Sequence, residues 1–109
     1  MVKSKVVEAM RFLEQSLKEE GLNDLRIILF GSQFKETATK DSDIDILILS
    51  KDFRGKDIFE RALLTKNSEI RTIKKFLIPL DIITMTPEEF KRGNSPITEF
   101  AKDGKVITA

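Results

Sequence analysis

Three aspartates of this chain have the side-chain type and the spacing that could bind divalent cations. Asp43 and Asp45 stand two positions apart at the start of an apolar run, and Asp81 lies inside a later apolar run. Magnesium prefers carboxylate oxygens and water as ligands, and a pair of magnesium ions can stabilise the charge that develops during transfer of a nucleotidyl group. The three carboxylates therefore predict a site for two Mg²⁺ ions, provided that the two apolar runs form neighbouring strands.

A glycine followed by a serine could hold the phosphates of a nucleoside triphosphate. Gly31 would let the backbone come close to a phosphate, and the Ser32 hydroxyl would donate a hydrogen bond to a phosphate oxygen. Alone, this pair is equally typical of a turn that ends a strand, and Asp81 alone could be an ordinary acid of an edge strand. Ten residues separate the pair from Asp43, and this position upstream of the aspartates favours a phosphate-binding role.

The elements expected to position these residues follow from the hydrophobic spacing. Residues 4–20 carry apolar side chains three and four positions apart, which predicts an amphipathic helix that ends at Gly21. Residues 25–30 predict a buried strand that ends at Gly31. The polar residues 33–42 predict a short helical turn and a loop.

The segment that contains the paired aspartates predicts a central strand. Residues 43–50 read as alternating aspartate and isoleucine followed by a continuous apolar run, which is typical of a strand covered on both faces. Because side chains alternate along a strand, one face should carry Asp43, Asp45, Leu47 and Leu49. Both carboxylates should therefore point the same way, at the end where the strand begins.

The second half of the chain predicts further helices and strands. Residues 58–77 have a helical pattern that is interrupted at 65–68, which leaves open one long helix or two short ones. Residues 78–85 predict a strand around Asp81, and Pro79 favours an edge position for it.

Capping signals predict where the last helices begin. Thr86, Pro87 and Glu89 have the pattern of an N-cap, a first-turn proline and a capping-box acid. A similar signal precedes residues 97–102, and residues 105–108 predict a small last strand.

Composition restricts the function classes. The chain of 109 residues has no Cys and no His, which excludes disulfides and imidazole chemistry, and its net charge of +1 gives no general attraction to nucleic acid. No apolar stretch is long enough to span a membrane, so a cytoplasmic location is expected. The length predicts a single domain over residues 1–109, and a domain this small is expected to work as a homo- or hetero-oligomer.

The combined motifs resemble a known family. Leu29-Phe30-Gly31-Ser32, ten intervening residues, Asp43-Ile44-Asp45-Ile46 and a later strand with Asp81 together resemble the minimal nucleotidyltransferase (MNT) family of the DNA polymerase beta superfamily. The resemblance covers nearly the whole chain. It implies an α/β (α+β) fold, with a small mixed β-sheet and helices packed mainly on one face.

The resemblance also implies roles for the candidate residues. Gly31 and Ser32 would bind the β- and γ-phosphates of ATP or another nucleoside triphosphate. Asp43 and Asp45 would ligate both Mg²⁺ ions, and Asp81 would ligate the catalytic ion and help to deprotonate the attacking hydroxyl. Free-standing domains of this family resemble antitoxins that pair with HEPN ribonuclease toxins, which implies a HEPN-type partner that the domain binds and can nucleotidylate.

One stretch departs from the family pattern and keeps other functions open. Where many relatives have Ala-Arg-Gly, this chain has Phe34, Lys35 and Glu36. Lys35 can still meet a phosphate as a point charge, without the two-pronged hydrogen bonding of arginine. Glu36 adds a negative charge that favours an alternative: a protein that masks a toxin without catalysis. A further alternative is a small-molecule nucleotidyltransferase of the antibiotic-modifying type.

Overall fold

A computed structural model describes residues 4–30, 44–93 and 105–106 of the chain. Four candidate site residues lie outside these ranges, namely Gly31, Ser32, Lys35 and Asp43. The loop expected at 33–42 and the helical segment expected at 97–102 lie outside them as well. Asp45 and Asp81 lie within the described residues.

The first two elements match the predicted ones. Helix α1 spans Ser4–Glu19 and strand β1 spans Arg26–Phe30. The apolar stripe of α1 is buried throughout: Val6, Met10, Leu13 and Leu17 are at most 3% exposed. Burial of this stripe holds α1 against the rest of the protein, as hydrophobic spacing in an amphipathic helix predicts.

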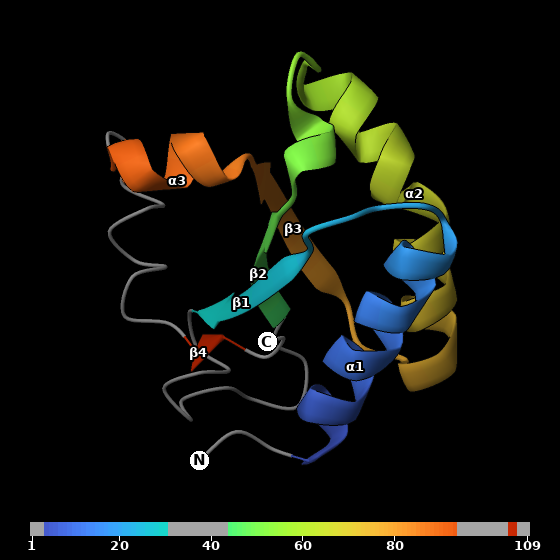
Figure 1. Ribbon diagram of the computed structural model, residues 1–109. Helices are drawn as coiled ribbons and strands as arrows, with labels where there is room; N and C mark the ends of the chain where they lie inside the picture. The colour runs from blue at the N-terminus through green and yellow to red at the C-terminus, as the bar shows by residue number, and fades with distance from the viewer. Residues whose placement is uncertain (1–3, 31–43, 94–104, 107–109) are drawn as a thin grey trace.

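The strands form one mixed sheet. Strand β2 spans Ile44–Leu49, β3 spans Leu80–Met85 and β4 spans Lys105–Val106, and the strand order is β3-β2-β1-β4. Strand β1 is antiparallel to β2 and to β4, whereas β2 and β3 are parallel. The predicted α/β class with a small mixed sheet is therefore confirmed, and so are the central position of β2 and the edge position of β3 (Figure 1).

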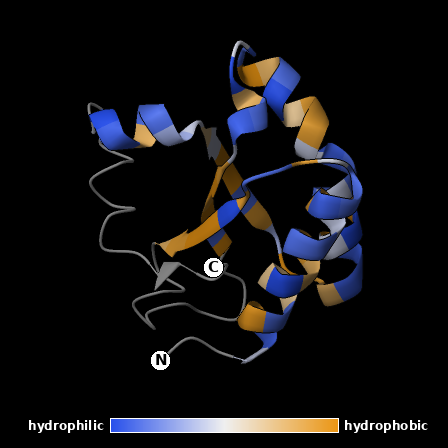
Figure 2. Cartoon of the chain, viewed as in Figure 1, coloured by the Kyte–Doolittle hydropathy of each residue, from blue (hydrophilic) through white to orange (hydrophobic). Residues whose placement is uncertain are grey.

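The strands are mostly hydrophobic (Figure 2). Their apolar side chains are buried on both faces of the sheet. On one face, Ile44, Ile46 and Ile48 of β2 pack with the stripe of α1 and with side chains of the second long helix. On the other face, Leu47 and Leu49 pack with residues of β1 and β3 and with Phe90 of the last helix. The central strand is thus covered on both sides, as its continuous apolar run predicts.

Residues 58–77 form one helix, which settles the alternative that the sequence leaves open. Helix α2 spans Ile58–Phe76 and crosses between the parallel strands β2 and β3 (Figure 1). It begins at a capping box, in which the Asp57 side chain accepts the Glu60 N–H at 2.8 Å and the Glu60 side chain accepts the Asp57 N–H at 3.0 Å. It ends at Leu77, whose positive φ of 55° stops the helical path.

The apolar residues that indicate α2 are not the ones it buries. Its fully buried side chains are Thr65, Ser68 and Thr72, with Leu64 and Phe76 partly buried. Hydrogen bonds join α2 to α1: the Ser16 hydroxyl donates to the Ser68 hydroxyl at 2.9 Å, and Arg71 donates to the Ser16 oxygen at 3.1 Å. The inward face of α2 is therefore largely polar.

A short helix follows β3. Helix α3 spans Pro87–Arg92 and begins at the predicted capping box, in which Thr86 accepts the Glu89 N–H at 3.1 Å. Phe90 turns its ring to the sheet face opposite α1 and α2. Within the described residues, no helix is long and apolar enough to cross a membrane.

Candidate active site

The sheet register brings Asp45 and Asp81 together. Asp45 of β2 and Asp81 of β3 are register partners in the parallel pair, and Phe30 of β1 is the partner of Asp45 on its other side. Neighbouring strands lie about 4.8 Å apart, and register partners project from the same face of a sheet. Both carboxyl groups therefore lie side by side near the ends where their strands begin.

The two acids share the sheet face that α1 and α2 do not cover. By strand alternation, Asp45 lies on the face of Leu47 and Leu49, and Asp81 on the face of Ile83 and Met85. Asp45 is half-buried and Asp81 is exposed. A ligand can therefore reach Asp81 from solvent, while Asp45 is held more firmly between its neighbours.

Negative charge gathers on this side of the protein. Two carboxylates on adjacent strands repel each other when both are ionised, and a nearby cation removes that cost. A further acid, Glu69 of α2, senses the same charge, since burial and then the Asp81 carboxylate raise the pKa of Glu69 above its ordinary value of 4.5. The Asp81 carboxylate and Glu69 are thus close enough to affect each other's surroundings at the edge strand.

A hollow that Glu69 helps to line lies between α2 and the edge strand β3. It has a volume of about 170 Å³, and its lining includes Ile58, Ala62, Thr65, Glu69, Ile82 and Thr84. Sites for small-molecule ligands usually measure about 300–1,000 Å³. The hollow is thus too small to hold a whole nucleoside triphosphate.

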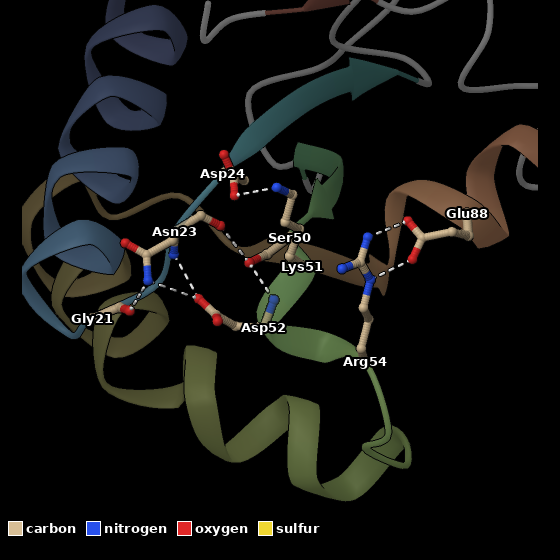
Figure 3. Close-up of polar contacts among 8 residues, drawn as sticks. All are labelled: Gly21, Asn23, Asp24, Ser50, Lys51, Asp52, Arg54 and Glu88. Atoms are coloured by element: carbon tan, nitrogen blue, oxygen red, sulfur yellow. Dashed lines mark hydrogen bonds and ion pairs between the residues drawn. The ribbon is translucent and has the colours of Figure 1, made fainter.

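Polar contacts fix the opposite end of the strands (Figure 3). The Ser50 hydroxyl, directly after β2, donates to the Asn23 carbonyl at 2.8 Å and accepts the Asp52 N–H at 3.1 Å. The Asn23 N–H donates to an Asp52 carboxylate oxygen at 2.7 Å, and Lys51 pairs with Asp24 at 3.1 Å. These contacts tie the start of β1 to the end of β2, and so they hold the alignment of that antiparallel pair at the end of the sheet away from Asp45.

Two arginines attach α3 to the segment between β2 and β3. Arg54 donates two hydrogen bonds to Glu88, one of them at 2.8 Å, and this pairing lowers the pKa of Glu88 (Figure 3). Arg61 of α2 donates to Glu89 at 2.7 Å. Burial tends to raise the pKa of Glu89, but hydrogen bonds from Thr86 and Arg61 outweigh it, so the pKa lies below 4.5. The arginines thus anchor the helix beside the acid-bearing face.

The structure describes two of the predicted site residues. It brings Asp45 and Asp81 together, whereas Gly31, Ser32, Lys35 and Asp43 lie outside the described residues. Within the described part of the chain, no group of three acids is close enough to hold a metal ion. A third carboxylate would have to come from Asp43, two positions before Asp45.

The sequence interpretation missed one acid near the pair. The acid is Glu69 of α2, whose pKa the Asp81 carboxylate helps to raise across the gap between α2 and β3. Nothing local in the sequence marks this glutamate, because its neighbourhood arises only when the helix lies along the edge strand.

Fold and acid pair together define the class of the protein. A small mixed sheet has its long helices on one face, and two acids project side by side from the other. The chain belongs to the nucleotidyltransferase domain family, whose sequence model matches residues 10–107. The predicted family is therefore confirmed.

Three solved structures with low sequence identity are similar to this chain, and the first two described here have the same fold. A protein named as a minimal nucleotidyltransferase has 21% identity and a TM-score of 0.50, over 91% of this chain and 93% of its own. A toxin-antitoxin structure with AMP-PNP has 23% identity and a TM-score of 0.57, over 89% of this chain and 71% of the other. A nucleotidyltransferase-like protein from Sulfolobus solfataricus has 21% identity and a TM-score of 0.48, over 97% and 87%. Comparison with curated protein sequences gives no match.

Proposed function

We propose that this chain transfers a nucleotidyl group from a nucleoside triphosphate, with ATP as the expected donor, and that Asp45 and Asp81 bind the Mg²⁺ ions that the reaction needs. The observation that carries the proposal is the register pairing of Asp45 with Asp81 on adjacent parallel strands. Membership in the nucleotidyltransferase domain family supports the type of reaction.

The donor atoms fit magnesium. Magnesium favours carboxylate oxygens and retains several waters, so two adjacent carboxylates, one exposed and one half-buried, suit it. Asp43, at a position where a strand would place it on the same face as Asp45, would add the third carboxylate. Bound magnesium supplies charge neutralisation for the phosphate oxygens and for the leaving pyrophosphate.

The other candidate residues have distinct tasks in this proposal. Gly31 and Ser32 hold the β- and γ-phosphates through backbone N–H groups and the hydroxyl, and Lys35 adds a positive charge. Asp81 also accepts the proton of the attacking hydroxyl, a role that suits its exposure to solvent.

We further propose a partner protein as acceptor. One structure with the same fold is a toxin-antitoxin complex with AMP-PNP, and the motifs of this chain resemble those of antitoxins paired with HEPN toxins. In this reading the chain is the antitoxin half of such a pair, and it binds its partner and nucleotidylates it.

Ligand binding provides the first test. Mg²⁺ with a non-hydrolysable ATP analogue should raise the melting temperature, because a ligand that binds only the folded state stabilises it. Asp45→Asn and Asp81→Asn should each abolish this rise. Asp24→Asn is the matched control, since Asp24 lies before β1 near the other end of the sheet and asparagine tolerates its positive φ of 49°. A full rise with Asp81→Asn would contradict the proposed site.

Label transfer provides the second test. With ATP labelled at the α-phosphate, Mg²⁺ and a HEPN-type partner, the chain should label the partner, and Asp45→Asn should slow labelling at least about 100-fold. Removal of Mg²⁺ by EDTA should stop it. Tight binding of the partner without any label transfer would instead identify the chain as a non-catalytic mask.

A further inference from the structure

Helix α2 carries an apolar stripe that points to solvent. Phe59 is 78% exposed, Leu63 is 70% exposed and Ile70 is 40% exposed. Lys66 lies between them and is exposed, and Leu77, the C-cap, is 81% exposed. We call these five residues the α2 stripe. Every large hydrophobic side chain that is exposed in the described residues belongs to this stripe, apart from its neighbour Ile58.

Helix α2 is oriented the opposite way from a normal surface helix. The fully buried residues of α2 are Thr65, Ser68 and Thr72, on the opposite side of the helix. A surface helix normally buries its apolar side and exposes its polar side. Exposed contiguous apolar surface of this kind marks an interaction site.

The spacing of the α2 stripe fits one particular kind of partner. Phe59, Leu63, Lys66 and Ile70 follow one another at intervals of four, three and four residues. This alternation makes the narrow seam along which two helices pack in a coiled coil. The 19 residues of α2 give a seam about 28 Å long. A second helix, rather than a flat surface or a small molecule, matches this shape.

The charges beside the seam determine the direction of the partner helix. Beside the seam, the first turn of α2 carries Glu60 and its last turn carries Lys74, whereas Lys75 lies over the Phe12 ring of α1. A helix with the same charge distribution that runs antiparallel places acidic groups against basic groups at both ends, and it also opposes the two helix dipoles favourably. A parallel copy would place like charges together. The surface is therefore complementary to itself in the antiparallel direction.

We propose that the α2 stripe is the interface of a homodimer, in which α2 packs antiparallel against α2 of a second copy. The half-buried Ile73, three residues after Ile70, continues the same spacing. The seam then forms three kinds of layer, each present twice by symmetry: Phe59 against Leu77, Leu63 against Ile73, and Lys66 against Ile70. Glu60 of each copy faces Lys74 of the other. Asn67 comes close to its own symmetry mate.

The dimer leaves the candidate active site free. The seam lies on the outer side of α2, whereas Asp45 and Asp81 project from the sheet face that α2 does not cover. The inference is therefore independent of nucleotidyl transfer, and association can be measured without nucleotide or magnesium. Loss of the dimer would not alter the proposed reaction, and loss of activity would not alter the proposed dimer.

Cross-linking tests the geometry. The chain has no cysteine, so Asn67→Cys introduces the only thiol. A short bismaleimide should join two copies of Asn67→Cys efficiently in dilute solution. Ile58→Cys is the matched control, because Ile58 is 72% exposed on the same helix but lies far from the two-fold axis, and it should not cross-link. Cross-linking of Ile58→Cys in place of Asn67→Cys would overturn the antiparallel alignment.

Sedimentation equilibrium tests the interface itself. The wild-type chain should dimerise, Leu63→Lys should raise the dissociation constant at least about tenfold, and Ile58→Lys should leave it within about twofold. Lys66→Leu should lower it, because a charged residue in a seam position weakens a coiled coil. Far-UV circular dichroism checks that each variant folds. A wild-type chain that stays monomeric up to about 1 mM, or a dimer that Leu63→Lys does not weaken, would overturn the proposal. Association only with a different protein through this stripe would overturn the second copy as occupant.

Discussion

Helices α1 and α2 lie against each other, yet their apolar stripes face in opposite directions. The stripe of α1 is at most 3% exposed, whereas three hydrophobic residues of α2, at positions 59, 63 and 70, are at least 40% exposed. Both patterns predict a helix equally well. The comparison shows that hydrophobic spacing identifies an amphipathic helix without telling whether the same chain or another molecule covers its apolar side.

Hydrogen bonds within α2 explain how this helix can turn a polar side inward. Its buried hydroxyls have acceptors nearby: Thr65 donates to the Ala62 carbonyl at 3.2 Å, and Thr72 donates to the Ser68 carbonyl at 2.7 Å. A buried hydroxyl that makes a hydrogen bond carries little energetic penalty. A ring contact between Phe12 and Phe76, with centroids 5.8 Å apart, adds apolar packing near the end of α2. Polar contacts and one aromatic pair thus replace the apolar stripe that holds α1.

The largest expected difference between the helices is the effect of truncating a leucine. Leu13→Ala in α1 should lower the free energy of unfolding by about 2–5 kcal/mol, because Leu13 is 0% exposed and its loss leaves a cavity. Leu63→Ala in α2 should change it by no more than about 0.5 kcal/mol. Urea unfolding followed by circular dichroism, at protein concentrations low enough to suppress association, measures both. Equal losses would show that the α2 stripe is buried within its own chain.

A smaller effect is expected at the N-terminus of α2, which depends on its cap more than on apolar burial. Asp57→Ala should lower the free energy of unfolding by about 1 kcal/mol, because the Glu60 N–H loses its acceptor at 2.8 Å. Asp57→Asn is the control and should retain most of the stability, since asparagine caps helices as well as aspartate. Thermal unfolding of the three proteins provides the measurement. An alanine variant as stable as the wild type would mean that the capping box does not hold α2.

The smallest expected effect is a pH dependence of the free energy of unfolding. It arises from Glu89 of α3, which accepts a hydrogen bond from Arg61 of α2. Hydrogen bonds from Thr86 and Arg61 hold the pKa of Glu89 below its ordinary value of 4.5. A carboxyl group whose pKa is lower in the folded state stabilises the protein above pH 4.5 and loses that contribution as the pH falls through the folded-state pKa. The Glu89→Gln variant should therefore be less stable than the wild type at neutral pH. The difference in the free energy of unfolding between the two proteins should become smaller below pH 4.5.

The narrowing is measured by urea unfolding from neutral to acidic pH. Glu20→Gln serves as the control, because Glu20 is exposed after α1 and its replacement should give a pH-independent difference close to zero. A Glu89→Gln gap that stays constant with pH would show that the carboxylate charge has no part in holding α2 and α3.

The sequence by itself determined the elements and the chemical character of the candidate site. The boundaries of α1, β1, β2 and α3 agree with the predicted ones to within a few residues, because helical spacing, capping boxes and turn glycines act over only a few positions. Aspartates inside apolar strands also stand out locally, since β-strands disfavour them. Strand alternation is also a local pattern, and so the position of Asp45 on the face of Leu47 could be predicted.

Only the tertiary structure decided which segments meet. Strand β3 lies parallel to β2 in a register that pairs Asp45 with Asp81, and it does so because α2 crosses over between them. Likewise, the outward direction of the α2 stripe and the effect of Asp81 on the pKa of Glu69 depend on how the helix packs. These features arise from hydrogen bonding and burial between distant segments. Which segments pair depends on the whole chain, and no short stretch of residues determines it.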